Sequence, residues 1–322
     1  MPATITHAFF AKDVYEILPS EIRNCLNLNR CKTFGQSTDA LMFYNLFLPL
    51  PGKKIRKFQS YSHSHQTQEF FINMLSYMKE NQIQDEDAYS FLVGFICHYI
   101  LDSIFHPYVI YRSGLMKKGK PDTYKYNNLH GFIETFFDMD MVKRRLNINP
   151  YRFNFGKFCF DLRPFSNDLK KVIDYTFDQT FHLKKMPSIY YRSLKQMKID
   201  LNLFRRDPYG IKKVFYKLAD TVTPRSVYRF EVISYHYPLE DRHDYLNKSH
   251  RLWRNPVIYD MTSTETFADL YIKALKQAKV VICASFDYLN GKSIDLTQIF
   301  PNTSYVTGLN CDLKKGLKYF EF

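Results

Sequence analysis

The segment HYILDSIFHP, residues 98–107, constrains the fold more than any other stretch, because it places ionisable side chains at helical spacing inside an apolar run. Residues four apart on an α-helix lie nearly above one another, so His98, Asp102 and His106 share one stripe. The residues from Phe91 to Leu101 are apolar apart from His98, which predicts a buried helix. Burying these groups without partners is costly, so the stripe must face something that satisfies it.

A second pair with the same spacing, His130 and Glu134, lies in the next predicted helix. Six of the ten histidines fall within the first 130 residues: His7, His63, His65, His98, His106 and His130. Imidazole and carboxylate are donors that zinc prefers, whereas calcium and magnesium favour oxygen ligands. A lone buried histidine is more often a hydrogen-bonded core residue, and a single i,i+4 pair can lie on a helix surface. Two such patterns on neighbouring helices favour a metal site over either explanation.

Helical periodicity dominates the chain, and capping residues and prolines mark the ends of the predicted helices. Pro107 is expected to end one helix, and a capping box of Thr262 and Glu265 to begin another that ends at Asn290-Gly291. Alternating strand patterns are few, and residues 226–237 are the best candidate. The fold class predicted is all-α, with helices over residues 6–18, 67–81, 85–107, 127–145, 166–181 and 262–289.

The 322 residues are enough for one large domain or two. The chain shows no internal repeat, and no linker rich in Gly, Ser or Pro marks a domain boundary. Residues 1–150 hold all the candidate metal-binding residues and form the predicted catalytic core. We interpret residues 151–322 as a helical continuation of the same domain.

The balance of charge is basic: 45 Lys and Arg against 32 Asp and Glu give a net charge of +13 and a pI near 9.2. Such a field favours anionic partners, namely phospholipid headgroups, nucleic acid or phosphorylated small molecules. The basic residues form short clusters at positions 53–57, 117–120, 143–145 and 314–315, and each alone is most simply a solvated surface. Together with the abundant aromatic residues they could bring the protein to an anionic membrane surface.

The first residues do not match a secretory signal peptide, because they lack a basic segment, an uninterrupted apolar stretch and a small-residue cleavage site. The apolar run 91–101 is too short to span a bilayer. The six cysteines include no Cys-x-x-Cys pair and are expected to be free thiols. We therefore expect a cytoplasmic protein, with peripheral membrane contact as an option.

Five segments, in order along the chain, resemble the zinc-dependent phospholipase C family in its divergent intracellular bacterial branch. They are THAFFAKDV, GQSTDALMFY, SHSHQTQEFF, GFICHYILDSIFHPYV and LHGFIETFFD. After residue 145, only LWRNPV and the helical segment that follows it resemble the family. The resemblance implies an all-α fold, similar to that of S1/P1-type nucleases, whose helices surround up to three zinc ions.

Carried over by position, the resemblance implies eight metal ligands: His7, Asp39, His63, His98, Asp102, His106, His130 and Glu134. One zinc would take Asp39, His63, His98 and Asp102; a second would take His106, His130 and Glu134; a third would take His7 and share Asp102. The spacing to the following Glu-Phe-Phe favours His63 over His65 without deciding between them. Secreted members complete the third site with an N-terminal tryptophan, whereas this chain begins Met-Pro-Ala, so we expect two or three zinc ions.

The resemblance also implies an enzyme, a metal-dependent phosphodiesterase that cleaves the bond between glycerol and phosphate in a phospholipid. Zinc would lower the pKa of a bound water so that hydroxide forms near neutral pH, and would neutralise the charge that develops on the phosphate. Asp39 is the candidate general base, since a carboxylate beside the nucleophilic water can orient it or accept its proton. The substrate headgroup and the oligomeric state stay open.

Two alternatives are kept. The first is a zinc nuclease of S1/P1 type that acts on single-stranded nucleic acid, which the basic charge and the 25 Tyr and 29 Phe would suit. The second is a non-catalytic binding protein that retains the fold and a structural metal. His243-Asp244 lacks companion His and Asp residues at suitable spacing and is interpreted as a surface pair.

Overall fold

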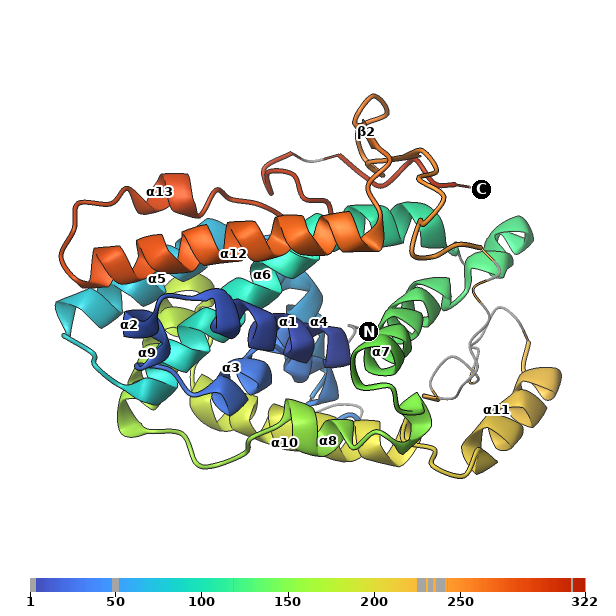
Figure 1. Cartoon of the computed structure of the whole chain (residues 1–322), viewed down its shortest axis with the longest axis horizontal. Helices are drawn as coiled ribbons and strands as arrows, with labels where there is room; N and C mark the ends of the chain where they lie inside the picture. The colour runs from blue at the N-terminus through green and yellow to red at the C-terminus, as the bar shows by residue number, and fades with distance from the viewer. Residues whose placement is uncertain are drawn as a thin grey trace.

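The computed structural model describes residues 4–47, 52–117, 119–224, 230, 234–235, 241, 243–313 and 315–321. Over these residues the fold is all-α, as predicted, with one small two-stranded sheet (Figure 1). The elements up to residue 152 are α1 (Thr4–Ile17), α2 (Ser20–Arg23), α3 (Leu28–Phe34), the 3-10 helix η1 (Ser37–Phe43), α4 (Lys53–Ser62), α5 (Thr67–Glu80), α6 (Glu86–Ser113), η2 (Pro121–Tyr126), α7 (Leu129–Leu146) and η3 (Pro150–Arg152).

The remaining elements pack on these helices. They are α8 (Phe155–Cys159), α9 (Asn167–Phe181), α10 (Met186–Phe204), α11 (Ile211–Val222), β1 (Trp253–Arg254), β2 (Thr262–Ser263), α12 (Phe267–Leu289) and α13 (Leu296–Ile299). The two strands are antiparallel, and their register pairs Trp253 with Ser263 and Arg254 with Thr262.

Helix α6 forms the centre of the fold and packs against α1, α3, α7, α9 and α12 (Figure 1). It begins after Asp85, whose side chain accepts a hydrogen bond from the backbone N–H of Ala88 at 2.8 Å. Its length and apolar composition would also suit a helix that crosses a membrane, but 83% of its most apolar stretch is buried inside the protein. Its apolar residues therefore serve the core that the other helices form around it.

The prediction that Pro107 ends this helix is wrong, because α6 continues through Pro107 to Ser113. A proline inside a helix leaves the carbonyl four residues earlier without its N–H partner. That carbonyl belongs to Ser103, and the backbone of Gly308 lies against it, so that a Cβ on Gly308 would come within 2.6 Å of the oxygen. The C-terminal segment thus covers the proline, which tertiary packing accommodates in the middle of the helix.

The predicted capping box of Thr262 and Glu265 is also wrong, because Thr262 lies in β2 and α12 begins later. The residues that cap α12 are Thr266 and Asp269. The Thr266 hydroxyl accepts the backbone N–H of Asp269 at 3.2 Å, and the Asp269 carboxylate accepts the N–H of Thr266 at 2.9 Å. The end of the helix at Asn290-Gly291 is confirmed.

The other predicted helices are confirmed, with ends that differ by one or two residues: 6–18 corresponds to α1, 67–81 to α5, 127–145 to α7 and 166–181 to α9. The candidate strand at 226–237 falls mostly outside the described residues, which include only Phe230, Ser234 and Tyr235 of it. The six cysteines are free, as expected.

Helices before and after residue 150 share one hydrophobic core. In particular, α10 packs against η1, α9 against α5, and α12 against both α6 and α1. This shared packing fixes the positions of α1, η1, α6 and α7, which carry most of the predicted site residues.

Candidate metal centre

The predicted site residues come from α1, η1, α6, α7 and the end of α4, and they meet at the middle of α6. On α6 itself, His98, Asp102 and His106 follow one another at intervals of one turn, as their spacing predicts. Asp102 Oδ2 lies 3.1 Å from His98 Nε2 and 3.6 Å from His106 Nδ1, so the three side chains form one continuous stripe. His98 and Asp102 are buried, and His106 lies nearer the surface.

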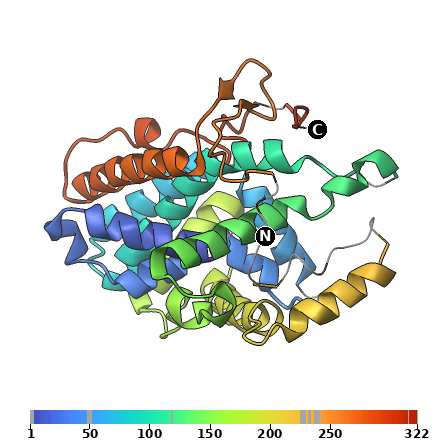
Figure 2. The ribbon, with the colours of Figure 1, turned by 45° about the vertical axis from the view of Figure 1, so that its right-hand side comes forward.

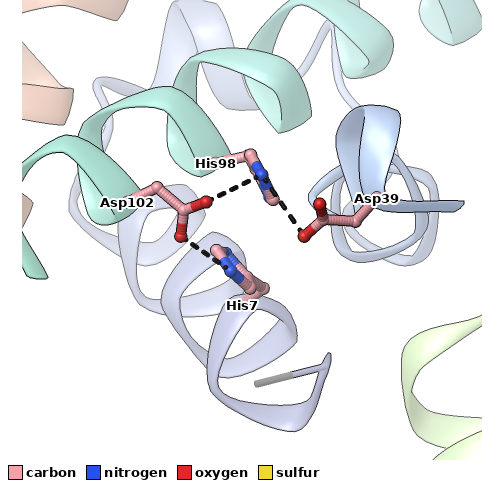
Figure 3. A group of neighbouring side chains, drawn as sticks. All are labelled: His7, Asp39, His98 and Asp102. Carbon is pink, nitrogen blue, oxygen red and sulfur yellow. Dashed lines mark ion pairs between the residues drawn. The ribbon is translucent and has the colours of Figure 1, made fainter. Parts of the chain in front are cut away.

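An inner group consists of His7, Asp39, His98 and Asp102, whose potential ligand atoms all lie within 4.8 Å of one another (Figure 3). His7 comes from α1, and its Nε2 is 3.2 Å from Asp102 Oδ1. Asp39 comes from η1, and its Oδ2 is 3.6 Å from His98 Nε2. The rings of His7 and His98 stack with their centroids 4.3 Å apart. All four side chains are buried, so the group is closed to solvent on most sides.

His63, the residue that follows α4, adjoins the inner group, and its Nε2 lies 3.2 Å from Asp39 Oδ1 and 3.7 Å from Asp102 Oδ2. His65, the alternative from the sequence, is exposed and stacks on Tyr61 with ring centroids 4.1 Å apart. The structure therefore brings His63, and not His65, to the group.

An outer group consists of His106, His130 and Glu134, whose potential ligand atoms also lie within 4.8 Å of one another. The Oε1 atom of Glu134 is 2.9 Å from His130 Nε2 and 3.4 Å from His106 Nε2. His130 is one turn before Glu134 on α7, so the predicted i,i+4 pair points towards α6. Asp102 approaches both groups, because it contacts His7 and His98 on one side and His106 on the other.

Backbone carbonyls orient three of the imidazoles. His98 Nδ1 lies 2.9 Å from the carbonyl oxygen of Gly35, His63 Nδ1 lies 2.8 Å from that of Gln59, and His106 Nδ1 lies 2.8 Å from that of Tyr305. A carbonyl only accepts hydrogen bonds, so each Nδ1 carries the proton and donates it. In the neutral rings, Nε2 is then a lone-pair donor that points towards the carboxylates, which is how histidine ligands are commonly held in metal sites.

When the rings are neutral, these lone pairs converge with no proton between them. In the neutral rings, the Nε2 atoms of His63 and His98 are 3.4 Å apart, and each also faces a carboxylate oxygen. Nδ1 of His7 is buried and has no hydrogen-bond partner among the described residues. Lone pairs and negative charges that meet in a buried place repel one another unless a cation lies among them. The donor set of nitrogen and oxygen atoms fits zinc.

The carboxylates of the site are held ionised. Burial alone would raise the pKa of Asp39, but the nearby imidazoles of His98 and His63 outweigh it and lower the pKa below its ordinary value. Burial would also raise the pKa of Asp102 and of Glu134. Neighbouring histidines outweigh it and lower the pKa of each carboxyl well below its ordinary value. Three buried negative charges thus lie close together, and the site requires positive charge to balance them.

Protons on the imidazoles are the other source of that charge. Burial would lower the pKa of His98, but Asp102 and Asp39 together raise it. Burial would likewise lower the pKa of His106, but Asp102 and Glu134 outweigh burial and raise this pKa to about 9. A divalent cation would compete with these protons for the same nitrogen lone pairs, so metal binding at this site is linked to proton release.

A cavity of about 260 Å³ opens over the outer group and the edge of the inner one. The residues at its polar end include Asp39, His63, His106, His130 and Glu134. The rest of its wall is formed by Met42, Gln59, Ser60, Ile110 and Val306. Ions held by the two groups would therefore face a space that a small polar group could enter, with apolar side chains beside it.

Two contributors to the site were not among the predicted residues. Gln59 donates a hydrogen bond from Nε2 to Asp39 Oδ1 at 2.5 Å, and it lies one turn before His63, a spacing that could have identified it. The carbonyl of Tyr305 accepts a hydrogen bond from His106 Nδ1. Its ring lies 4.9 Å from the ring of His63, and its backbone N–H donates to the His63 carbonyl at 2.8 Å. No local pattern links Tyr305 to the first 134 residues. His243-Asp244 lies elsewhere, where the Asp244 carboxylate accepts the backbone N–H groups of Lys248 and Ser249.

Comparison with known families gives one match. The family model described as zinc-dependent phospholipase C matches residues 6–186, which is more than half of the chain and includes all eight predicted ligands. No match to a curated protein and no match to a solved structure was found. The match and the buried nitrogen and oxygen donors agree on the same chemistry, and the chain belongs to the zinc-dependent phospholipase C family.

Proposed function

We propose that the protein is a zinc-dependent phosphodiesterase of phospholipase C type, which hydrolyses the bond between glycerol and phosphate in a phospholipid. One observation carries the proposal: imidazole lone pairs and ionised carboxylates converge at the polar end of an open cavity. A metal that only stabilised the fold would be expected to lie in a closed set of ligands, whereas here the ligands face a space that substrate can reach.

The residues divide into two sets of candidate ligands. The inner ion would be held by Asp39, His63, His98 and Asp102, and the outer ion by His106, His130 and Glu134, as their proximity supports. His7 with Asp102 would hold a third ion if one binds. Zinc bound in these places lowers the pKa of coordinated water and neutralises negative charge on a phosphate group.

Asp39 is the proposed general base. It lies at the cavity, and Gln59 fixes its Oδ1 atom by a hydrogen bond, which leaves the carboxylate oriented towards the inner group. A water molecule beside it would lose a proton to the carboxylate as the water oxygen attacks phosphorus. The bond from phosphorus to the glycerol oxygen breaks, the glycerol oxygen takes up a proton, and the products are diacylglycerol and a phosphomonoester.

The lining of the cavity favours a lipid over a nucleic acid. Nucleases of single strands commonly stack bases on aromatic side chains. The described residues that line this cavity include Met42, Ile110 and Val306 beside the polar end, but no Tyr, Phe or Trp. Aliphatic side chains suit the glycerol and the first carbons of an acyl chain better than they suit a base.

The test is release of phosphomonoester from phosphatidylcholine micelles by the full chain loaded with zinc, with single-stranded DNA as the competing substrate. Asp39→Asn should lower turnover by about a hundredfold, the size typical of losing a general base, while far-ultraviolet circular dichroism stays unchanged. Asp140→Asn, which removes a carboxylate that pairs with Arg144 away from the site, is the control and should keep full activity. Hydrolysis of DNA alone would replace the proposal with the nuclease. If neither substrate is hydrolysed and Asp39→Asn mainly lowers stability, the metal is structural.

A further inference from the structure

Helix α11 turns its apolar side to the solvent. Its apolar residues recur at the spacing of one helix face, and all are between 56% and 82% exposed: Ile211, Val214, Phe215, Leu218 and Val222. We call these five residues the α11 stripe. None of the residues of α11 is buried, so the stripe does not serve the core. This arrangement is the reverse of that of an ordinary surface helix, whose apolar face packs inwards.

Polar groups hold the other face of α11 against the protein. Lys212 donates from Nζ to the carbonyl oxygens of Leu203 and Arg206, both at 2.5 Å, at the C-terminal end of α10. Tyr216 donates its hydroxyl to the carbonyl oxygen of Phe204 at 2.9 Å. These bonds satisfy carbonyls that the end of α10 leaves open, and they fix the helix with its stripe outwards.

Further exposed apolar side chains lie on α10, the helix before α11, and just after η1, the element that carries Asp39. Ile199 and Leu203 on α10 are exposed, and so are Leu46 and Phe47, which follow η1. The ring of Phe47 lies 5.9 Å from the ring of Phe204 at the end of α10. An exposed apolar area of this kind marks an interaction surface rather than an isolated side chain.

The charge around this surface is positive. Residues 195–222 contain seven Lys or Arg, of which Arg205 is buried, and three Asp. Two of these aspartates, Asp200 and Asp207, are buried, and the third, Asp220, accepts the backbone N–H of Phe230. Beyond Phe47, at the start of α4, Lys53, Lys54 and Lys57 are exposed. An apolar stripe bordered by lysines has the chemistry of a helix that lies in the interface of an anionic bilayer.

We propose that the α11 stripe docks the protein on an anionic phospholipid membrane, with α11 lying parallel to the bilayer surface. Figures 1 and 2 both show α11 projecting from the body of the protein, at the end where η2 and the start of α7 also lie. The start of α7 carries His130 of the outer group. The proposal deepens the proposed phospholipase activity and rests on it for its purpose, because docking here would bring substrate to the side of the molecule that carries the cavity.

A second copy of the chain is a poorer occupant than a membrane. In a symmetric dimer the same patch meets itself, so the lysines of α10 and α11 would face their own copies. Like charges brought face to face oppose association, whereas anionic headgroups would neutralise the lysines.

The test is sedimentation of the full chain with phosphatidylcholine vesicles that contain phosphatidylglycerol, measured in the Asp39→Asn background so that the vesicles stay intact. Replacing Phe215 and Leu218 together by serine should weaken binding by about tenfold for each side chain withdrawn from the bilayer. The matched control replaces Ile272 and Val280, which are exposed on α12, by serine and should bind as the parent does. Binding should fall in high salt and on vesicles of phosphatidylcholine alone.

A second readout uses Phe215→Trp in the same vesicles. The only natural tryptophan, Trp253, is buried, so a blue shift of emission on adding vesicles would report insertion of position 215. An unshifted emission together with unweakened binding of the serine variant would overturn the proposal, and so would a dimer that the serine variant dissociates. Membrane binding through α11 without phospholipid hydrolysis by the parent would refute the proposed enzyme but keep the docking surface. If the parent hydrolyses phospholipid and the serine variant binds vesicles as strongly as its parent, the docking surface is refuted and the enzyme is kept.

Discussion

The carboxylate of Asp102 lies 3.1 Å from Nε2 of His98, one turn earlier on α6, and also within 3.7 Å of ring nitrogens of His7, His63 and His106. A buried carboxylate that reaches His98 with one oxygen and His7 with the other is positioned to be shared between an inner ion and a third ion beside His7.

Asp102→Asn should lower zinc content at the inner group, and also beside His7 where a third ion binds, because one side chain contributes to both sets of ligands, whereas the outer ion should stay. The change also leaves buried imidazoles without their counter-charge and should reduce the free energy of unfolding by about 3 kcal/mol. Plasma mass spectrometry and urea denaturation measure the two effects. An unchanged zinc content would show that Asp102 holds no ion.

His63→Ala and His65→Ala form a matched pair of histidines two residues apart. His63→Ala removes a buried nitrogen 3.2 Å from Asp39 Oδ1 and should lower zinc affinity at the inner group. His65 is exposed and stacks on Tyr61, so His65→Ala should leave zinc affinity unchanged. Competition with a chromogenic chelator measures both. Equal losses in the two variants would mean that the structure misplaces the ligand.

Asp138 on α7 holds the start of α1, the helix that carries His7. Its carboxylate accepts the backbone N–H groups of Ile5 at 3.1 Å and Thr6 at 2.7 Å, and the hydroxyl of Tyr235 at 2.6 Å. Asp138→Ala leaves these buried donors unsatisfied and should lower the free energy of unfolding by about 3 kcal/mol. It should also weaken zinc binding, since His7 is one residue beyond this cap.

Thr6→Val is the graded control for Asp138. It removes only the Thr6 hydroxyl, which donates to Asp138 Oδ1 at 2.9 Å, and should cost about 1 kcal/mol. Urea denaturation orders the variants. A cost for Thr6→Val equal to that of Asp138→Ala would argue against the backbone cap as the main role of Asp138.

Gly308→Ala should destabilise the protein more than Gly291→Ala. Both glycines have positive φ, at +66° and +90°, which costs alanine about 1 kcal/mol in either place. Only at Gly308 would the new Cβ meet an obstacle, the Ser103 carbonyl oxygen at 2.6 Å, whereas nothing lies within 4 Å at Gly291. The difference between the two free energies of unfolding measures the contact that covers Pro107, and a difference of zero would contradict that contact.

Asp200 on α10 should make stability depend on pH. Burial raises the pKa of its carboxyl to about 6, above the value in the unfolded chain, so the folded protein favours the protonated form. Its contribution is therefore present in full below about pH 4 and is lost as the pH rises through 6. Relative to the parent, Asp200→Asn should gain stability between pH 4.5 and 7. Parallel pH profiles of the two proteins in urea denaturation would contradict this.

Local spacing predicted the parts of the site that lie on one helix. His98, Asp102 and His106 were placed correctly because an i,i+4 pattern fixes a helix face whatever surrounds it. His130 and Glu134 followed by the same argument. The resemblance to the family, rather than any spacing, pointed to His7 and Asp39.

Tertiary contacts explain what the sequence did not show. Pro107 stays within α6 because Gly308, two hundred residues later, lies against the carbonyl that the proline leaves open. Thr262 and Thr266 both begin a possible capping box, and pairing of β2 with β1 decides between them. The carbonyl of Tyr305 reaches His106 only through the folded chain, so no local signal announces it.

Metal ions are expected to occupy both the inner and the outer group. Anomalous X-ray scattering at the zinc absorption edge, from crystals of the zinc-loaded protein, locates such ions. We expect one peak in contact with His63 and His98 Nε2, and another in contact with His106, His130 and Glu134. Well-ordered crystals with no peak at either group would contradict the metal centre and the proposed function that depends on it.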